Sequence, residues 1–303
     1  MARYLEDLPQ NGRVVVVRLR SLGDCVLTTP ALQLLKGARP DLRVAVVVED
    51  RFRPVFEGNP DIETLLGPGT GAVRGFAPHL CLNLHGGGTS AKLTALSGAR
   101  WRAGFAHFRY SFLYNIRIPR AQEILDLERK VHTAEHLASA VFYLGVPPSG
   151  IPRARLFADG TPGGEPYAVI HPMASERSKM WSEESFLAIA GHLKHSLGVE
   201  PVFIAGPGEN LSAFREYRIV CGAPLGKVKS LLKGAVLFLG NDSGPAHMAA
   251  AFGIPTVVIF GSSDQMIWRP WKTPSEVLTN PAGIGFVRVE EVRGALERLR
   301  VHA

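Results

Sequence analysis

The stretch that most constrains the fold is residues 235–264, AVLFLGNDSGPAHMAAAFGIPTVVIFGSSD. It opens with a short apolar run, 235–239, which is typical of a buried strand. Pro245 then suits the first turn of a helix, because its missing N–H would be unpaired there anyway. Small residues continue to Gly253, and 256–260 form a second apolar run. The order strand, turn, helix, strand is the repeating unit of an α/β fold with a parallel sheet.

Polar residues gather in this stretch where its first strand ends. In an open α/β sheet, ligands bind at the carboxyl ends of the strands. Backbone N–H groups over 243–246, with the positive end of the helix behind them, would bind a phosphate group. Asp242 and Ser243 could equally serve only to cap the helix. The residues alone leave a phosphate site and a plain helix cap as alternatives.

Strand and helix patterns alternate along the whole chain, which predicts two domains of the same class. Apolar runs of strand length lie at 14–19, 44–49, 79–84, 167–170 and 201–205. Prolines and glycines crowd into 146–166, which indicates a linker. The length of 303 residues allows a hydrophobic core on either side of it. We therefore expect an α/β chain with Rossmann-like domains at 1–150 and 151–303.

Charge and cysteine usage narrow the class of partner and the compartment. The net charge of +7 favours an anionic partner. Six basic residues and no acidic one lie between Lys92 and Arg120, interleaved with aromatic residues. The three cysteines are widely spaced in apolar contexts, so we expect reduced packing residues. With no signal-peptide pattern and no apolar run long enough to cross a membrane, the expected location is the cytoplasm.

Three motifs, in this order along the chain, carry a resemblance to one family. They are the opening VVVVRLRSLGDCVLTTPAL at 14–32, the triplet Lys179-Met180-Trp181, and NDSGPAHMAAAFGIPTVVIFG at 241–261 with WRPW after it. Together they resemble the bacterial heptosyltransferases, glycosyltransferase family 9. The resemblance implies a GT-B fold, with two Rossmann-like domains facing each other across a cleft. The first domain would bind the acceptor and the second the nucleotide sugar, and the last helix, 289–300, could pack back on the first domain.

The resemblance also implies an activity. It is transfer of a heptose from ADP-heptose to a hydroxyl of the lipopolysaccharide inner core, with inversion. Relatives that use another nucleotide sugar or an acceptor outside lipopolysaccharide remain alternatives. Neither a metal nor another cofactor would be required. The partners would be the nucleotide sugar and an acidic glycolipid at the cytoplasmic face of the inner membrane, with no nucleic acid.

Site residues follow from matching the motifs position by position. The resemblance implies that Asp24 is the general base and that Lys179 neutralises charge on the leaving diphosphate. From the residues alone, Asp24 could be a helix N-cap and Lys179 a solvated loop residue. The expected donor-binding residues are Glu209, Asp242, Ser243, Gly244, Pro245 and His247. The expected acceptor-binding residues are Ser21, Gly23, His85, Gly86, Arg100, Arg102 and Arg109.

Two other functions compete with this one. His132, Glu135 and His136 fit the pattern H-x-x-E-H, in which two histidines bind zinc and the glutamate acts as base. The same segment also reads as an ordinary amphipathic helix over 129–144. A nucleic-acid-binding module is the other possibility, because the basic and aromatic residues of 92–120 could stack on bases. No nucleic-acid motif accompanies them.

Overall fold

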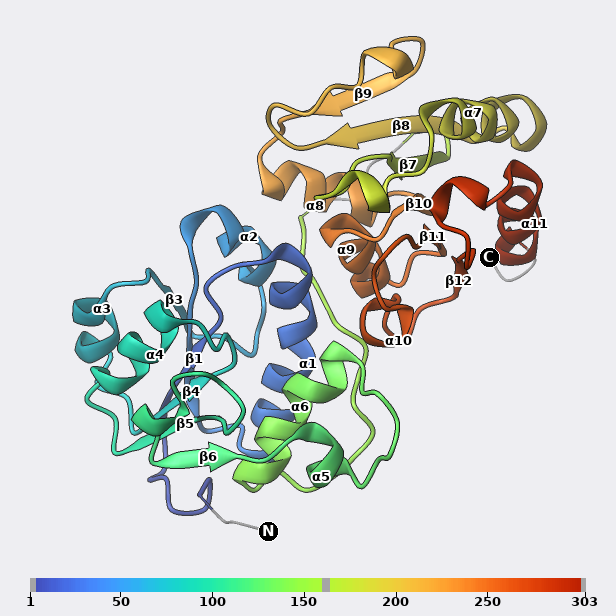
Figure 1. Ribbon diagram of the computed structural model, residues 1–303. Coiled ribbons are helices and arrows are strands. Elements are labelled where there is room, and N and C mark those ends of the chain that lie inside the picture. Colours follow the sequence, from blue (N-terminus) through green and yellow to red (C-terminus); the bar gives the residue numbers. More distant parts are fainter. Residues whose placement is uncertain (1–3, 160–163, 301–303) are drawn as a thin grey trace. The chain divides into compact units, whose positions relative to one another are not determined.

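The computed structural model describes residues 4–159 and 164–300. The chain divides into two compact units, Met1–Phe157 and Ala158–Ala303. Each unit is a six-stranded parallel sheet with helices, which confirms the predicted α/β class (Figure 1). Part of the expected linker at 146–166 belongs to the first unit. Arg155 donates its backbone N–H to the Thr29 hydroxyl and pairs with Asp61, both of them in that unit.

The first sheet has the strand order β3-β2-β1-β4-β5-β6. Its strands are β1 (Arg13–Val17), β2 (Arg43–Val47), β3 (Thr64–Leu66), β4 (Leu80–Asn83), β5 (Trp101–Phe105) and β6 (Ile116–Ile118). From their second residue on, strands β1 and β2 are buried and mostly β-branched, as is typical of a parallel sheet covered on both faces. Chain order reverses between β1 and β4, which makes the gap between their carboxyl ends the topological switch point.

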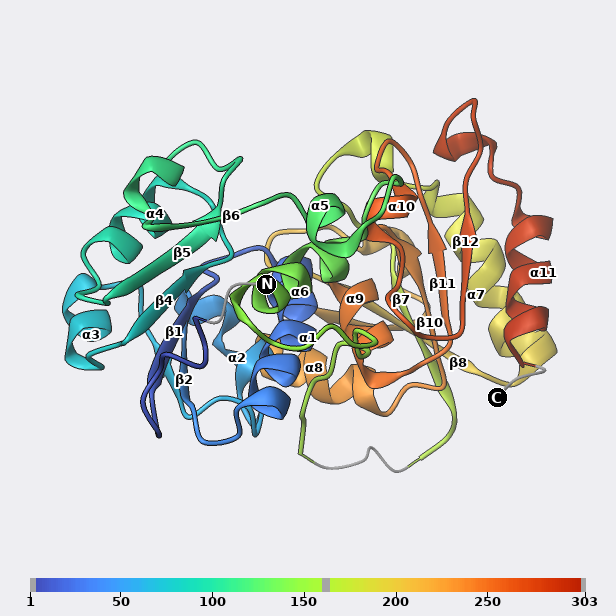
Figure 2. The ribbon, with the colours of Figure 1, turned by 90° about the horizontal axis from the view of Figure 1, so that it is seen from below.

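Helices cover both faces of this sheet (Figure 2). They are α1 (Leu22–Ala38), α2 (Arg53–Phe56), α3 (Thr70–Gly75), α4 (Gly88–Ala95), α5 (Ala121–Leu125) and α6 (Thr133–Leu144), with short 3-10 turns η1 (Asp50–Phe52) and η2 (Ser111–Leu113). Val73 of α3 and Leu93 of α4 lie in one hydrophobic cluster with Val15 and Val17 of β1. Helices α1 and α6 pack against each other on the other face.

Strands β5 and β6 come from the basic, aromatic segment at 92–120, where the sequence predicted a ligand-binding surface and no strands. Ala103 and Phe105 of β5 are buried, and so are Ile116 and Ile118 of β6. Arg117, between the two isoleucines, is exposed. Side chains alternate across a strand, so its charged residues can face solvent while their neighbours enter the core. The strands were not predicted because charged residues interrupt their apolar runs.

The second sheet has the strand order β12-β11-β10-β7-β8-β9, the same topology as the first. Its strands are β7 (Tyr167–His171), β8 (Glu200–Ala205), β9 (Arg218–Cys221), β10 (Leu237–Asn241), β11 (Thr256–Ile259) and β12 (Ser275–Leu278). Its helices are α7 (Glu183–Leu197), α8 (Leu225–Lys233), α9 (Gly244–Phe252), α10 (Gln265–Trp268) and α11 (Val289–Arg300), with 3-10 turns η3 (Arg177–Lys179), η4 (Ser212–Phe214) and η5 (Ile284–Phe286). The switch point lies between β7 and β10.

Helix α11 packs within its own unit, beside α7 and against β11 and β12 (Figure 1). Val292, Ala295, Leu296 and Leu299 are buried in the same hydrophobic cluster as Phe186 of α7. That this helix also packs on the first domain stays a prediction. Its apolar face is already buried against the second sheet.

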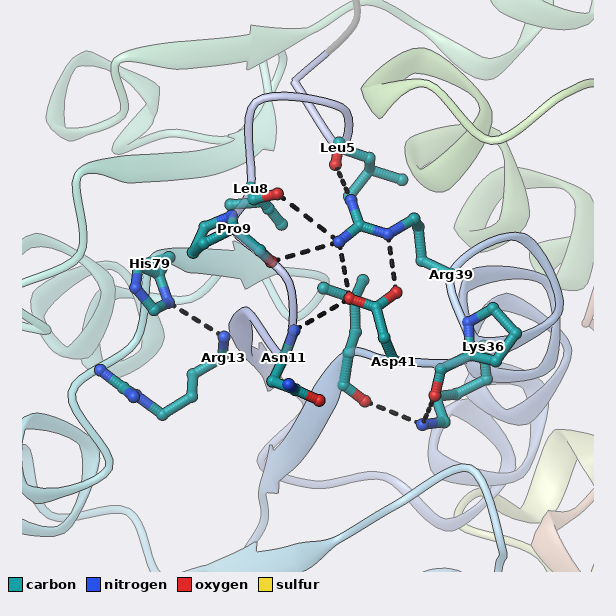
Figure 3. Close-up of polar contacts among 11 residues, drawn as sticks. Leu5, Leu8, Pro9, Asn11, Arg13, Lys36, Arg39, Asp41 and His79 are labelled. Atoms are coloured by element: carbon teal, nitrogen blue, oxygen red, sulfur yellow. Dashed lines mark hydrogen bonds and ion pairs between the residues drawn. The ribbon is translucent and has the colours of Figure 1, made fainter.

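The segment before β1 is fastened at the amino end of the first sheet by a polar network around Arg39 (Figure 3). The Arg39 guanidinium donates to the carbonyls of Leu5, Leu8 and Pro9. It also forms a forked pair with the Asp41 carboxylate, at 2.8 Å for both contacts, and Asp41 accepts the backbone N–H of Asn11. These contacts lie at the edge opposite the carboxyl ends of the strands, so they belong to the scaffold.

Two further sequence expectations can be compared with the structure. Among the described residues, no helix is both long enough and apolar enough to span a bilayer. Cys25 and Cys81 are buried, and burial raises the pKa of each thiol to about 12, as expected of packing residues. Cys221 is exposed, contrary to expectation, because it ends the edge strand β9.

Candidate functional site

In the first unit, the strands on either side of the switch point both end in polar residues. After β1 the chain turns sharply at Ser21, whose φ of 71° is unusual for a residue other than glycine. Ser21 is the N-cap of α1, and Asp24 lies inside the first helical turn. The alternative of Asp24 as the N-cap is therefore wrong, because the helix begins two residues before it. Backbone strain of this kind is often found at functional sites.

Asp24 is paired with a buried arginine that the sequence analysis did not single out. Arg18 Nη1 lies 3.5 Å from Asp24 Oδ1, and the Asp24 side chain keeps 22% of its surface exposed. Arg18 Nη2 donates to the carbonyl of Leu84, next to β4. Burial lowers the pKa of Arg18, whereas the negative charge of Asp24 raises it. The guanidinium remains ionised at neutral pH in either case. A permanent positive charge thus stands beside the candidate base.

The loop after β4 is shaped by Asn83. Its side-chain oxygen accepts the backbone N–H groups of His85 at 2.9 Å and Gly86 at 3.1 Å. Gly86 has a φ of +83°, and a Cβ there would lie 2.8 Å from the ring of Phe108. Burial, and then Arg18 and Arg20, lower the pKa of His85, so its imidazole is neutral at pH 7. This loop offers a neutral ring and close backbone approach at the same edge as Asp24.

The three expected acceptor arginines do not lie together. Trp101 of β5 pairs in parallel with Leu80 of β4, so Arg100 and Arg102 stand at the amino end of the strand. That is the edge of the sheet opposite Asp24. Arg109 follows the carboxyl end of β5, in the loop whose rings lie against two glycines, Phe108 at Gly86 and Tyr110 at Gly88. Of the three, only Arg109 lies at the edge that carries Asp24.

The H-x-x-E-H segment is a helix cap, and the zinc interpretation is wrong. His132 is the N-cap of α6, where its Nδ1 accepts a backbone N–H. Glu135 accepts the backbone N–H of His132 at 2.8 Å and is held by Arg129 at 2.6 Å. His136 instead stacks on Phe105, with ring centroids 4.0 Å apart. Over residues 4–159 and 164–300, no group of three or more His, Cys, Asp or Glu could hold a metal ion.

In the second unit, Asn241 at the end of β10 organises the loop that carries Lys179. Asn241 is fully buried. Its amide donates to the carbonyl of Pro172 at 2.7 Å, and its oxygen accepts the backbone N–H of Trp181 at 3.1 Å. The Trp181 indole donates to the carbonyl of Val287 at 2.8 Å. Both ends of the loop 172–181 are thereby fixed to the sheet.

Lys179 ends the 3-10 turn η3 and acts electrostatically on Asp242. A Cβ at Gly261 would lie 2.2 Å from the carbonyl oxygen of Ser178, so the loop is packed directly on the turn after β11. Burial raises the pKa of Asp242, and the Ser263 hydroxyl and the Lys179 ammonium lower it. Lys179 and Asp242 therefore belong to one polar group at the carboxyl ends of β10 and β11.

The amino end of α9 completes this group. Ser243 is the N-cap residue, but its hydroxyl makes no cap hydrogen bond and lies 3.0 Å from His171 Nδ1 at the end of β7. Gly244 and Pro245 open the helix. Pro245 has no N–H, and the N–H of Ala246 bonds to the Ser243 carbonyl at 3.2 Å. The predicted phosphate-binding donors of 243–246 therefore narrow to the N–H groups of Ser243 and Gly244.

Glu209 and His247, the two remaining predicted donor-binding residues, both contact other residues of the second unit. Glu209 accepts the backbone N–H of Gly206 at 2.5 Å, which closes the turn after β8, the strand beside β7. Its carboxylate thus lies at the same edge of the sheet as Ser243. His247 is buried, and its ring meets that of Trp268 edge-on, with centroids 6.2 Å apart. This contact favours a packing role for His247.

Four polar residues of these two edges were missed by the sequence analysis. They are Arg18, Asn83, His171 and Asn241. Each ends an apolar strand beside a switch point, either as its last residue or immediately after it. A single polar residue closing a run such as VVVVR or YAVIH was the available signal. The loops that follow these strands carry more conspicuous motifs.

Known proteins similar to this chain agree with the fold. The model of glycosyltransferase family 9 (heptosyltransferase) matches residues 73–289. Lipopolysaccharide heptosyltransferase 3 of Escherichia coli is 29% identical over 289 residues, which cover 84% of each chain. The structure of E. coli heptosyltransferase WaaC with ADP superposes with a TM-score of 0.79 at 19% identity, covering 95% of this chain and 99% of that one.

A further solved structure is TibC from enterotoxigenic E. coli H10407, described as an iron-containing dodecameric glycosyltransferase. It has a TM-score of 0.67 at 17% identity, covering 97% of this chain and 79% of TibC. At this identity the likeness extends to the fold. The family model covers well over half of the chain, including the whole second sheet, so this chain belongs to glycosyltransferase family 9, the heptosyltransferase family.

Proposed function

We propose that this chain transfers a heptose from ADP-heptose to a hydroxyl of the lipopolysaccharide inner core, with inversion at the anomeric carbon. Family membership supports transfer of this kind. The ADP in the WaaC structure and the lipopolysaccharide in the name of the E. coli relative support the donor and the acceptor. The observation in this chain that carries the proposal is the Asp24 carboxylate, which caps no helix and is paired with Arg18.

Asp24 is the general base in this proposal. Its carboxylate takes the proton of the acceptor hydroxyl as that oxygen attacks the anomeric carbon of the heptose. The new carbon–oxygen bond forms on the face opposite the diphosphate. The bond from the anomeric carbon to the diphosphate oxygen breaks, and ADP departs with the electron pair. Arg18 holds the carboxylate in place through a charge that does not titrate near neutral pH.

The second unit would bind the donor. Negative charge develops on the departing diphosphate, and fixed positive groups aimed at it stabilise the transition state. Lys179 and the N–H groups of Ser243 and Gly244 are the groups in this role. Asp242 would repel a phosphate, so we assign it to sugar or ribose hydroxyls. Glu209 would accept a hydrogen bond from the ribose.

The first unit would bind the acceptor. Ser21 and Gly23 shape the turn that presents Asp24, and His85 and Gly86 border it from the loop after β4. Arg109 would meet an acidic group of the glycolipid. A lipid-linked acceptor of this kind would place the enzyme on the cytoplasmic face of the inner membrane as a peripheral protein.

We also propose that no metal is needed. Lys179 and the amino end of α9 can supply the positive charge that a divalent cation would otherwise provide. Treatment with EDTA should therefore leave turnover unchanged. Activity that is lost with EDTA and restored by iron or magnesium would overturn this part of the proposal and leave the assignment of Asp24 standing.

The experiment that tests the donor assignment is calorimetric binding of nucleotides to the purified protein. ADP should bind about tenfold or more tightly than UDP or GDP. ADP-heptose should release ADP only when a heptose-deficient lipopolysaccharide core is added. Asp242→Ala should weaken binding of ADP-heptose, whereas Asp264→Asn, at the cap of the short helix α10, serves as the matched control. Preference for UDP or GDP would contradict the proposed donor.

A further inference from the structure

The pair formed by His171 and Ser243 joins two segments 72 residues apart at the switch point of the second sheet. A serine at an N-cap ordinarily accepts a backbone N–H of its own helix. Ser243 does not, and its Oγ lies 3.0 Å from His171 Nδ1. His171 is 8% exposed at the end of β7, and burial lowers its pKa to about 4. At pH 7 its ring is therefore neutral and carries a single N–H.

The position of that N–H decides what Ser243 offers to a ligand. If Nδ1 carries the hydrogen, it donates to Ser243 Oγ, and the hydroxyl hydrogen is free to donate elsewhere. If Nε2 carries it, Nδ1 must accept the hydroxyl hydrogen, and Ser243 presents only lone pairs to the ligand. Phosphate oxygens are acceptors, so only the first arrangement adds a donor to the amino end of α9.

We propose that His171 is a positioning residue that donates Nδ1–H to Ser243 Oγ and thereby directs the Ser243 hydroxyl hydrogen to the diphosphate of the donor. This proposal rests on the donor site described above. It assigns to His171 no contact with the substrate. A neutral ring is suited to this role because it sets the direction of one hydrogen bond without adding a buried charge.

The first test reads the tautomer directly and needs no ligand. Nitrogen-15 spectra of histidine-labelled protein at pH 7 should show one neutral ring with a protonated Nδ1. That signal should be absent from His171→Asn, which identifies it. A neutral His171 ring protonated at Nε2 would overturn the proposal, whether or not the protein binds ADP.

The second test measures ADP and adenosine binding by calorimetry. His171→Leu removes the donor, whereas His171→Asn keeps an N–H near the position of Nδ1. His171→Leu and Ser243→Ala should each weaken ADP binding about tenfold, the size expected of one hydrogen bond to a charged group. The double variant should lose no more than either single one. His171→Asn should recover most of the affinity, and adenosine binding should change less than about twofold.

The controls separate this proposal from the proposed function. Equal losses for ADP and adenosine would mean that His171 only supports the fold, and would overturn the positioning role. Additive losses in the double variant would overturn the link to Ser243. A wild-type protein that binds no ADP would instead refute the donor assignment, and the tautomer measurement would still decide the hydrogen-bond direction.

Discussion

A buried basic residue stands at the carboxyl end of the first strand of each unit: Arg18 immediately follows β1, and His171 is the last residue of β7. The two sheets share one strand order, so these residues occupy corresponding places at the two switch points. Arg18 carries a charge and lies 3.5 Å from a carboxylate, whereas His171 is neutral and lies 3.0 Å from a hydroxyl. The same topological position thus holds a cation in one unit and a neutral ring in the other.

The difference between Arg18 and His171 follows from the group that the carboxyl edge of each sheet has to bind. Asp24 is itself an anion, and a partly buried anion is stable only with a partner of opposite charge. At the second edge, the anion would be the diphosphate of the donor, which comes and goes with each turnover. Lys179 and the amino end of α9 can meet it from the loops. A further buried cation at His171 would have no partner in the free protein and would cost several kcal/mol.

The largest expected effect comes from Asp24. Asp24→Asn should lower kcat about a thousandfold, because it removes the general base and keeps a side chain of similar shape. ADP affinity should stay within about twofold, since the donor is assigned to the second unit. Measuring ADP release and ADP binding on the same preparation checks both. A variant with kcat within tenfold of wild type would show that another group accepts the proton.

Removing the charge at Arg18 should have the next largest effect. Arg18→Gln keeps a polar side chain with an N–H donor but leaves Asp24 without its cation. We expect kcat to fall by about tenfold to a hundredfold, as for loss of a hydrogen bond to a charged group. Arg18→Lys should recover part of the loss. If both variants lose activity equally and both melt at lower temperature, Arg18 acts through packing. The comparison of a charged Arg18 with a neutral His171 would then say nothing about function.

Buried neutral histidines should make folding sensitive to acid. Burial lowers the pKa of His136 to about 4. His107 and Arg18 act in the same direction, and Asp24 opposes them. Below its ordinary pKa of about 6.5, the unfolded chain binds a proton that the folded chain does not, so stability falls as the pH drops from 6.5 toward 4. At pH 5 the cost is about 1 to 2 kcal/mol.

Phenylalanine at position 136 would keep the ring stacked on Phe105 and remove the titration. His136→Phe should therefore lose less stability between pH 7 and pH 5 than wild type, by about 1 to 2 kcal/mol in urea unfolding. His195→Asn, at an exposed position of α7, is the matched control and should follow wild type. An unchanged pH dependence in His136→Phe would show that His136 is solvated.

The elements that follow from local pattern were predicted well, and the contacts that depend on topology were not. Helix α11 has the predicted bounds of 289–300, because its apolar spacing and flanking residues are local signals. The His171–Ser243 pair joins strands that neighbour each other only through the strand order. Neither segment contains a sequence signal that predicts contact with the other. This part of the site could therefore be identified only from the structure.

Arg100 and Arg102 show the same limit from the other side. They carry the same charge as Arg109 and lie in the same segment, so the sequence analysis places all three on one surface. Which edge of the sheet a residue occupies depends on where its strand begins. The sequence analysis did not recognise β5, so it could not distinguish residues at the start of that strand from a residue just beyond its end.

Charge reversals at Arg100 and Arg109 should have the smallest effects, and only the second should be felt by the acceptor. Arg100 and Arg109 are both exposed, and each guanidinium lies over the ring of the next residue, at 4.8 Å from Trp101 and 5.6 Å from Tyr110. They differ in the edge of the sheet. Arg109→Glu should raise the KM for the acidic acceptor about fivefold to tenfold and leave ADP affinity unchanged, as expected for one surface charge reversed near an anion.

Arg100→Glu makes the same chemical change at the opposite edge and should leave the acceptor KM within about twofold of wild type. The effect of Arg109→Glu should also shrink as salt is raised from 0.05 to about 0.5 M, because exposed charges are screened over a few ångströms at that ionic strength. Equal effects of the two substitutions would mean that the acceptor senses only the net charge of the first unit. In that case Arg109 would not support placing the acceptor at the edge of the sheet that carries Asp24. The placement of the acceptor site would then rest on Asp24 alone.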